Sequence, residues 1–312
     1  MKSLNKKLLD VNNLSVSFKM YDKTLTQSEL EVISDLSVSV NEGEILAIAG
    51  SSGSGKSLLA HAVLGLLPAN ASYSGEVLFM GEELTSEKQK ELRGSQIALV
   101  PQSVAFLDPL MKVGNQVIGH EPNASKKDAK KEVFERLSLD DTVDKLYPFQ
   151  LSGGMARRVL LSTAVIGSAS LIIADEPTPG MQLEQSLEAM KIFRELADEG
   201  KGIMLITHDI DLAFNFADKV AVFYAGTTVE VARASDFIKG ISALRHPYSK
   251  ALWQALPQNG FKPIEGTQPY ADRLPKGCLF APRCNMRTQL CEKERPDMKN
   301  IRGGEVRCHY AT

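Results

Sequence analysis

The sequence has few aromatic residues and no excess of charge of either sign. Aromatic residues make up 6% of the 312 positions, with one tryptophan, and 36 Lys and Arg residues balance 38 Asp and Glu residues. A net charge of -2 provides no basic surface for nucleic acid or anionic lipid, so we expect neither as a partner. No apolar run approaches the roughly 18 residues of a membrane-spanning helix, and residues 1–7, although basic, do not lead into the apolar segment of a signal peptide. We therefore expect a cytosolic chain unless another protein holds it at a membrane.

Cysteine is missing from most of the chain, which excludes a disulfide framework there. The four cysteines, Cys278, Cys284, Cys291 and Cys308, all stand near the C-terminus with spacings wider than the short CxxC pairs typical of zinc sites. Four thiolates can also hold an iron-sulfur cluster. The residues alone leave open a cluster, a zinc ion and free thiols, with His309 as an alternative ligand.

Short apolar segments alternate with stretches of helical periodicity, which is typical of an α/β fold with a parallel sheet and helices on its faces. With 43% hydrophobic residues, the chain has enough apolar side chains for a packed core. Four apolar segments predict strands of this sheet: residues 45–49, 97–100, 171–174 and 203–206.

Helices are predicted on either side of these strands. One covers residues 57–67 and is stopped by Pro68, and another covers residues 183–199 and ends at Gly200. A mainly helical insert, about residues 103–160, separates the second and third predicted strands.

The C-terminal part differs in composition from the rest. From about His246 onward Pro, Gly and Cys become frequent, and apolar segments become rare. We therefore predict one domain over residues 1–245, which contains the insert, and a small appended extension over residues 246–312.

A glycine-rich loop connects the first predicted strand to the first predicted helix. It fits the pattern GxxxxGK[ST] in the strand-loop-helix context that this motif requires. Its backbone N–H groups and the helix N-terminus attract phosphate, Lys56 is placed to reach the β- and γ-phosphates, and Ser57 to bind magnesium. A glycine-rich turn that binds nothing is the alternative. The predicted phosphate-binding residues are Gly50, Ser51, Ser52, Gly53, Ser54, Gly55, Lys56 and Ser57.

Polar residues suited to phosphoryl transfer follow the other predicted strands. Asp175 is placed to hold magnesium and Glu176 to act as general base toward water. His208 follows the fourth strand as a candidate sensor of the γ-phosphate, and Gln102 follows the second as a ligand in the magnesium–water shell. Each has a structural alternative, such as a solvated acidic turn, a structural histidine or a loop glutamine.

The segment Leu151-Ser152-Gly153-Gly154-Met155, read together with the glycine-rich loop, resembles the ATP-binding subunits of ABC transporters over roughly residues 8–312. The resemblance implies a P-loop ATPase core with a parallel sheet, an antiparallel β part, a helical insert and ATP and Mg2+ as ligands. Ser152, Gly153 and Gly154 match the signature, which completes the ATP site of a second ATPase across a dimer interface. The other matches are Lys56 and Ser57 to Walker A, Gln102 to the Q-loop, Asp175 and Glu176 to Walker B, and His208 to the switch histidine.

The resemblance also implies an aromatic residue that stacks on adenine. Phe18, upstream of the glycine-rich loop, is the best positioned match, and Tyr21 is the second choice. Either residue is alternatively part of the core.

Within that family, three segments are similar to importers of di- and oligopeptides and of nickel: residues 147–149, 246–257 and 277–284. This branch implies two membrane permease subunits and an extracytoplasmic solute-binding protein as partners. It places the chain at the cytoplasmic face of the membrane, held there by the permeases through Gln102 and the insert. Peptide and nickel, or a nickel chelate, both remain possible as cargo. Some members of this branch hold a [4Fe-4S] cluster in a similar four-cysteine extension, with Zn2+ as the alternative here.

Several positions depart from the family pattern. Residues 179–182 replace a stretch that normally ends in an aspartate bridging the two ATPases, and Met155 and Arg157 replace frequent glutamines. We therefore expect the second ATPase to be a different chain. One alternative function is a weakly hydrolytic, regulatory subunit of such a pair. A DNA- or ribosome-directed ATPase is disfavoured because the chain has no second cassette, coiled-coil insertion or basic patch.

Overall fold

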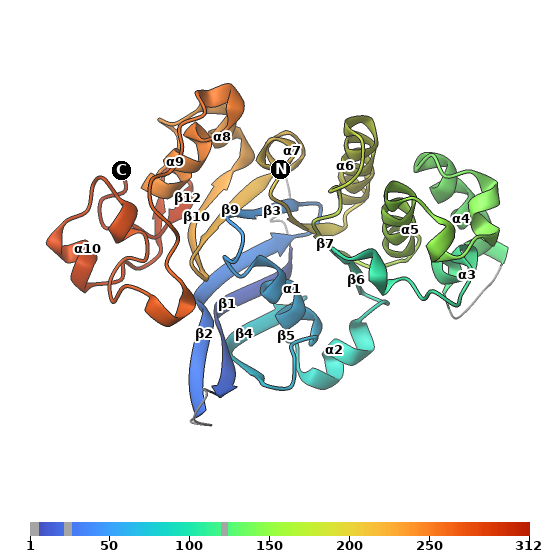
Figure 1. Ribbon diagram of the computed structural model, residues 1–312, viewed down its shortest axis with the longest axis horizontal. Coiled ribbons are helices and arrows are strands. Elements are labelled where there is room, and N and C mark those ends of the chain that lie inside the picture. The colour runs from blue at the N-terminus through green and yellow to red at the C-terminus, as the bar shows by residue number, and fades with distance from the viewer. Residues whose placement is uncertain (1–5, 22–26, 120–123) are drawn as a thin grey trace.

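The computed structural model describes residues 6–21, 27–119 and 124–312, and its strands form two sheets (Figure 1). The larger sheet has the strand order β11-β12-β10-β9-β3-β8-β7-β6. Strands β9, β3, β8, β7 and β6 run parallel to one another, whereas β10, β12 and β11 are antiparallel. The bounds are β3 Ile45–Gly50, β6 Ile97–Val100, β7 Leu171–Asp175, β8 Gly202–Ile206, β9 Lys219–Tyr224, β10 Thr227–Arg233, β11 Lys299–Ile301 and β12 Gly304–Val306.

The predicted α/β fold with a parallel sheet is confirmed, and all four predicted strands are present as β3, β6, β7 and β8. Every residue of β3, β7 and β8 is buried, because helices or the second sheet cover both faces. The parallel arrangement brings the C-terminal ends of β3, β6, β7 and β8 to one edge. The polar residues that follow these strands therefore gather along that edge.

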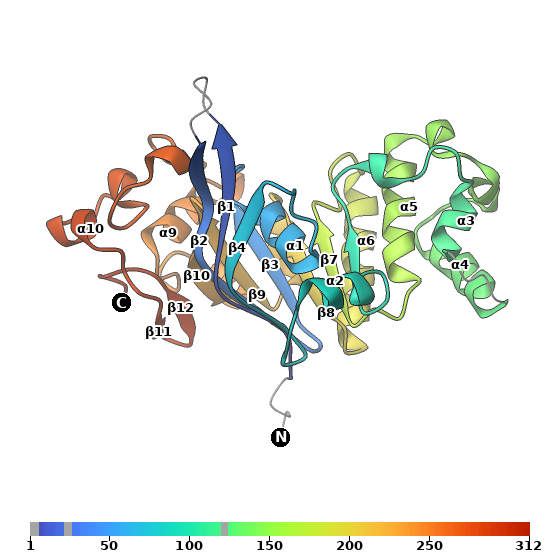
Figure 2. The ribbon, with the colours of Figure 1, turned by 90° about the horizontal axis from the view of Figure 1, so that it is seen from below.

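The smaller sheet is antiparallel and has the order β2-β1-β4-β5. Its strands are β1 Lys7–Tyr21, β2 Gln27–Asn41, β4 Ala71–Phe79 and β5 Glu82–Glu83. Helix α1, Lys56–Leu64, packs with the apolar faces of β1, β2 and β4 and with one face of the larger sheet in a single hydrophobic core. Figure 2 shows α1 between this sheet and the strands β7 and β8.

Helix α1 ends earlier than the sequence predicts. The chain leaves the helix at Gly65, which adopts a left-handed conformation (φ 63°) and donates its N–H to Ala62 O. A left-handed glycine is a usual helix terminator. Pro68 therefore lies beyond the end and does not set it.

Most of the helical insert lies on the opposite side of the sheet from the C-terminal extension (Figure 1). It contains α3 Val113–Ile118, α4 Ala124–Arg136 and α5 Gly153–Val165, which share a core with α6 Leu183–Asp198 and one face of β6 and β7. Val133 and Leu137 of the insert lie in this core. The limits of the insert, about 103–160, stay a prediction.

The remaining helices are α2 Ser86–Leu92, α7 Ile210–Phe216, α8 Ala234–Lys239, α9 Pro247–Gln254 and α10 Gln289–Lys293. Helices α7, α8 and α9 share a third core with β9, β10 and Phe280 of the extension. The hairpin β11–β12 of the extension joins the larger sheet through β10. The extension is thus continuous with the sheet, and the predicted boundary at residue 245 stays a prediction. Over the described ranges, no helix is both long and apolar enough to cross a membrane.

Candidate nucleotide-binding site

The glycine-rich loop turns sharply between β3 and α1. At Gly50 a Cβ atom would come within 2.5 Å of Phe223 O on the neighbouring strand, so only glycine fits. Gly55, at φ 94°, is the N-cap of α1 and lets the helix begin at Lys56. The loop therefore presents the N-terminus of α1 with its free N–H groups to the surface, which favours an anion.

Lys56 folds back onto the glycine-rich loop itself. Lys56 Nζ donates to Gly50 O at 2.9 Å and to Ser51 O at 3.0 Å. Burial lowers the pKa of Lys56, and the carboxylates of Glu176 and Asp175 partly oppose this shift. Ser54 Oγ has no hydrogen-bond partner among the described residues, but its side chain is fully buried and so does not face an open ligand site.

Ser57 and Asp175 meet at the end of β7. Ser57 Oγ donates to Asp175 Oδ1 at 3.2 Å. Burial raises the pKa of Asp175; the Ser57 hydrogen bond opposes the shift, and the nearby Glu176 charge adds to it. A buried carboxylate of this kind is stabilised by a cation. The pair presents oxygen ligands of the type that Mg2+ prefers.

Glu176 lies at the centre of a group of polar side chains. Its backbone has a positive φ of 47°, which is uncommon for glutamate and is held by a hydrogen bond from its N–H to Ile206 O. Gln102 Nε2 donates to Glu176 Oε2 at 2.8 Å, and His208 Nδ1 lies 3.4 Å from Glu176 Oε1. The three residues predicted from separate strand ends are therefore in contact.

A cavity of about 260 Å³ joins this group to the glycine-rich loop. Lys56, Ser57, Gln102 and Glu176 all line it. The cavity thus places a cationic side chain, a hydroxyl and a carboxylate base around one space, as phosphoryl transfer to water requires. Its lining residues are Val32, Ser52, Gly53, Gly55, Lys56, Ser57, Leu58, Gln102 and Glu176.

Arg157 is a residue of this site whose role the sequence did not reveal. It lies on the second turn of α5, and its Nη1 donates to Gln102 O at 2.7 Å and to Glu176 O at 2.9 Å. The guanidinium therefore ties the segments that carry Gln102 and Glu176 to each other. The one sequence signal for Arg157 was that it stands where the family frequently has glutamine.

Ser152, Gly153 and Gly154 lie at the start of α5. Ser152 is the N-cap, and its Oγ accepts from Met155 N at 3.3 Å. Ser152 and Gly153 are exposed, and none of the three lines the 260 Å³ cavity. They present a second helix N-terminus at a different place on the surface.

Phe18 and Tyr21, the candidates for stacking on adenine, lie on β1. Phe18 is half-buried against the core that contains α1 and is paired with Leu30 of β2. Tyr21 is 65% exposed at the end of the strand. Neither lines the 260 Å³ cavity.

The four cysteines line one small cavity of about 20 Å³, together with His246 and His309. None forms a disulfide. Burial, with a smaller contribution from the neighbouring cysteines, raises the pKa of Cys278 to about 11; burial also raises the pKa of Cys284 and of Cys308. Within the described ranges, no three His, Cys, Asp or Glu side chains are close enough together to hold one metal ion.

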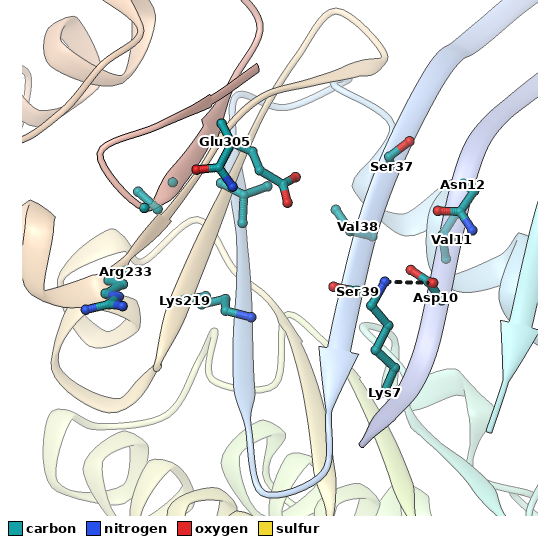
Figure 3. Close-up of a pocket in the computed structure, with 15 residues that line it drawn as sticks. Lys7, Asp10, Val11, Asn12, Ser37, Val38, Ser39, Lys219, Arg233 and Glu305 are labelled. Carbon is teal, nitrogen blue, oxygen red and sulfur yellow. Dashed lines mark hydrogen bonds and ion pairs between the residues drawn. The ribbon is translucent and has the colours of Figure 1, made fainter. Parts of the chain in front are cut away.

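Another cavity, of about 340 Å³, lies away from the glycine-rich loop between the two sheets (Figure 3). Its walls carry charges of both signs, and Lys7 and Asp10 pair with each other at 2.8 Å. Lys219 pairs with Glu44 at 2.6 Å. These lysines are thus neutralised by the chain itself, and no residue of the predicted motifs lines this cavity.

Comparison with known families gives two matches along the chain. A model described as ABC transporter matches residues 33–179, and a model described as the oligopeptide/dipeptide transporter C-terminal region matches residues 229–291.

Similar proteins align over nearly the whole chain. The oligopeptide transport ATP-binding protein OppD of Haemophilus influenzae is 35% identical, with 96% of each chain covered. The dipeptide transport ATP-binding protein DppD of Bacillus subtilis is 35% identical over 93% of this chain and 90% of its own, and OppD of Escherichia coli is 36% identical over 97% and 93%. A solved dimeric ABC transporter cassette matches with a TM-score of 0.64 at 24% identity, covering 72% of this chain and 98% of the cassette. The fold is therefore that of an ABC ATPase.

Proposed function

This chain belongs to the ABC transporter ATP-binding proteins and hydrolyses ATP, and we propose that hydrolysis drives the import of oligopeptides or dipeptides. The observation that supports peptide as the cargo is the match of residues 229–291 to the oligopeptide/dipeptide transporter C-terminal region. OppD and DppD, which align over nearly the whole chain, are named for the same two cargo classes. We therefore propose peptide rather than nickel as the cargo.

ATP would bind with its phosphates at the N-terminus of α1. Support comes from the uncapped N-terminus of α1 and from Lys56 and Ser57, which line the 260 Å³ cavity beside it. We propose that Lys56 turns from Gly50 O and Ser51 O to the β- and γ-phosphates when the nucleotide binds. Mg2+, held by Ser57, Asp175 and Gln102, would neutralise charge on the phosphates.

Glu176 is the proposed general base. Its carboxylate takes a proton from water while the water oxygen forms a bond to the γ-phosphorus, and the bond to the bridging oxygen breaks to release ADP and phosphate. The contact at 2.8 Å from Gln102 and the positive φ of 47° fix the direction of this carboxylate. His208, at 3.4 Å from Glu176, would bind the γ-phosphate.

A second ATPase subunit would complete this site. The exposed N-terminus of α5, with Ser152, Gly153 and Gly154, is suited to bind the γ-phosphate of ATP held by that partner. We propose that the partner is a different chain, because residues 179–182 of this chain lack the bridging aspartate of the family pattern.

The cargo would pass through two membrane permease subunits and be delivered by an extracytoplasmic solute-binding protein. We propose that the permeases hold this chain at the cytoplasmic face of the membrane. Phe106 and Leu110, which follow Gln102 in the sequence, are large exposed apolar side chains and are suited to that contact.

For the cysteine cavity we propose a [4Fe-4S] cluster. Four free thiols around one cavity supply the required donor set, and their raised pKa values would be offset by a cationic core. Each cysteine of such a cluster binds its own iron, so the four sulfurs need not converge on one point, as they would on a zinc ion. The cluster would tie together a segment with few apolar residues.

The experiment that tests the catalytic assignment uses the assembled transporter in vesicles. Glu176→Gln keeps the shape and the contact to Gln102 but removes the base, so we expect ATP turnover to fall about 100-fold or more with ATP binding retained. Radiolabelled dipeptide uptake is expected to stop in parallel. Turnover near the wild-type rate would refute Glu176 as the base.

The matched control carries the equivalent change in the partner ATPase. If this chain were only regulatory, the partner variant would abolish turnover and Glu176→Gln would leave it intact. Uptake of Ni2+ in place of dipeptide by the unmodified complex would overturn the cargo assignment.

A further inference from the structure

The C-terminal extension reaches the glycine-rich loop. Residues 264–273, here called the 264–273 loop, pass beside it, and Gln268 Oε1 accepts from Ser51 Oγ at 2.6 Å and from Ala225 N at 3.3 Å. Ser51 belongs to the phosphate-binding loop. The extension and the nucleotide site are therefore joined by a direct side-chain contact.

The 264–273 loop is anchored from behind by Arg283. Its Nε donates to Glu265 O at 2.8 Å and its Nη2 to Ile264 O at 3.0 Å. The same guanidinium lies over the ring of Tyr224, 5.8 Å from the centroid. The loop is thus held in place at its start by Arg283 and in its middle by Gln268.

Between this loop and the glycine-rich loop lies a cavity of about 580 Å³. One wall is formed by Thr267–Asp272 and the other by Leu30, Ser52 and Gly53. Ser52 and Gly53 also line the 260 Å³ phosphate cavity, so the two spaces adjoin at the glycine-rich loop. The larger cavity thus offers space next to the phosphate cavity for the rest of a nucleotide.

Tyr270 is the aromatic residue in the wall of this larger cavity, and its side chain is 76% exposed. It follows Pro269, whose ring restricts the backbone, and has no part in the hydrophobic cores described above. Leu30 of β2 lines the same cavity and is paired with Phe18 of β1, and directly paired residues point to the same face of a sheet. The cavity is therefore bordered by Tyr270 on the 264–273 loop and by Leu30 on β2.

We propose that the 264–273 loop binds the adenosine half of ATP, with Tyr270 stacking on the adenine ring. The C-terminal extension is then part of the ATP site. This proposal rests on ATP binding to this chain and does not depend on the cargo.

The test compares ADP with pyrophosphate, its base-free counterpart, by calorimetric titration of the full-length chain with Mg2+. We expect Tyr270→Ala to raise the Kd of ADP about tenfold, within the range that base–aromatic stacking contributes. The Kd of pyrophosphate is expected to stay unchanged. Tyr270→Phe keeps the ring and is expected to bind ADP like the wild type.

Phe261 provides a matched control, because it is an exposed aromatic of the same extension (72% exposed) outside this cavity. Phe261→Ala is expected to change neither Kd. An ADP Kd within twofold of wild type in Tyr270→Ala would overturn the proposal. So would an equal loss for pyrophosphate, because the loop would then support the phosphate site and not the base. Neither outcome bears on peptide import, which the vesicle assay measures separately.

Discussion

Arg157→Ala is the change that most directly tests how the catalytic group is held together. Arg157 donates to Gln102 O at 2.7 Å and to Glu176 O at 2.9 Å. Glu176 has a backbone conformation that glutamate rarely adopts, so it persists because its surroundings hold it. Without Arg157, we expect Glu176 and Gln102 to move away from the attacking water.

The magnitude follows from the two hydrogen bonds. A hydrogen bond with a charged donor contributes about 1.5 kcal/mol at the lower end of its range. Arg157 is half-buried, so water replaces part of each lost contact, and we expect a net loss of about 2 kcal/mol in transition-state stabilisation. At about 1.4 kcal/mol for each factor of ten, turnover falls about thirtyfold.

The assay is steady-state ATP turnover of the assembled complex at saturating ATP. Arg157 lines neither the phosphate cavity nor the 580 Å³ cavity, so the Kd of ADP is expected to stay unchanged. Arg157→Lys keeps one donor and is expected to lose about fivefold. The control is Arg287→Ala, which removes an exposed arginine of the C-terminal extension and is expected to change neither ATP turnover nor the Kd of ADP.

A turnover of Arg157→Ala within threefold of the wild type would refute the reasoning. A drop in ADP affinity or in melting temperature comparable to the drop in turnover would also refute it, because Arg157 would then support the fold in general and not the base in particular.

Two further predictions concern the cysteine cavity and the buried Arg245–Glu230 pair. If the cysteine cavity holds a cluster, protein purified without oxygen is brown with equal iron and acid-labile sulfide, and Cys291→Ser loses both; colourless protein with bound zinc would contradict the assignment. Arg245→Met removes the cationic partner of the fully buried Glu230, which keeps only backbone donors, and is expected to destabilise the chain by about 3 kcal/mol in urea unfolding. Lys7→Ala, which breaks the exposed pair with Asp10, is expected to destabilise it by less than about 1 kcal/mol. Equal losses of unfolding free energy in the two variants would show that burial of the ion pair does not determine the loss.

The strand ends could be predicted from the sequence because their information is local. An apolar segment of four or five residues followed by a polar residue gives both the strand and its end, and parallel strands bring such ends to one edge. Gln102, Asp175 and His208 were found in this way. The left-handed conformation of Glu176 could not be predicted, because glutamate rarely adopts it and the contacts that hold it, from its N–H to Ile206 O and from Arg157 to its carbonyl, come from distant parts of the chain.

The contacts across the fold could not be predicted, because no local pattern encodes them. Gln268 and Ser51 are 217 residues apart in the sequence, and each looks like an ordinary loop residue. Arg157 is one of two adjacent arginines on α5, and helical periodicity does not tell which one faces the catalytic group. Arg158 instead donates to Leu137 O and Ser138 O inside the insert.

Helix α5 connects the two ATP sites that a pair of such subunits would form. It begins at Ser152, the residue proposed to bind the partner's ATP, and its second turn carries Arg157, which holds Gln102 and Glu176. Because a helix moves as a rigid unit over one or two turns, an ATP that drew the N-terminus of α5 toward the partner would also shift Arg157. We therefore expect the geometry of Glu176, the proposed base, to depend on whether the partner's site is filled, and Arg157→Ala to weaken that dependence as well as the turnover.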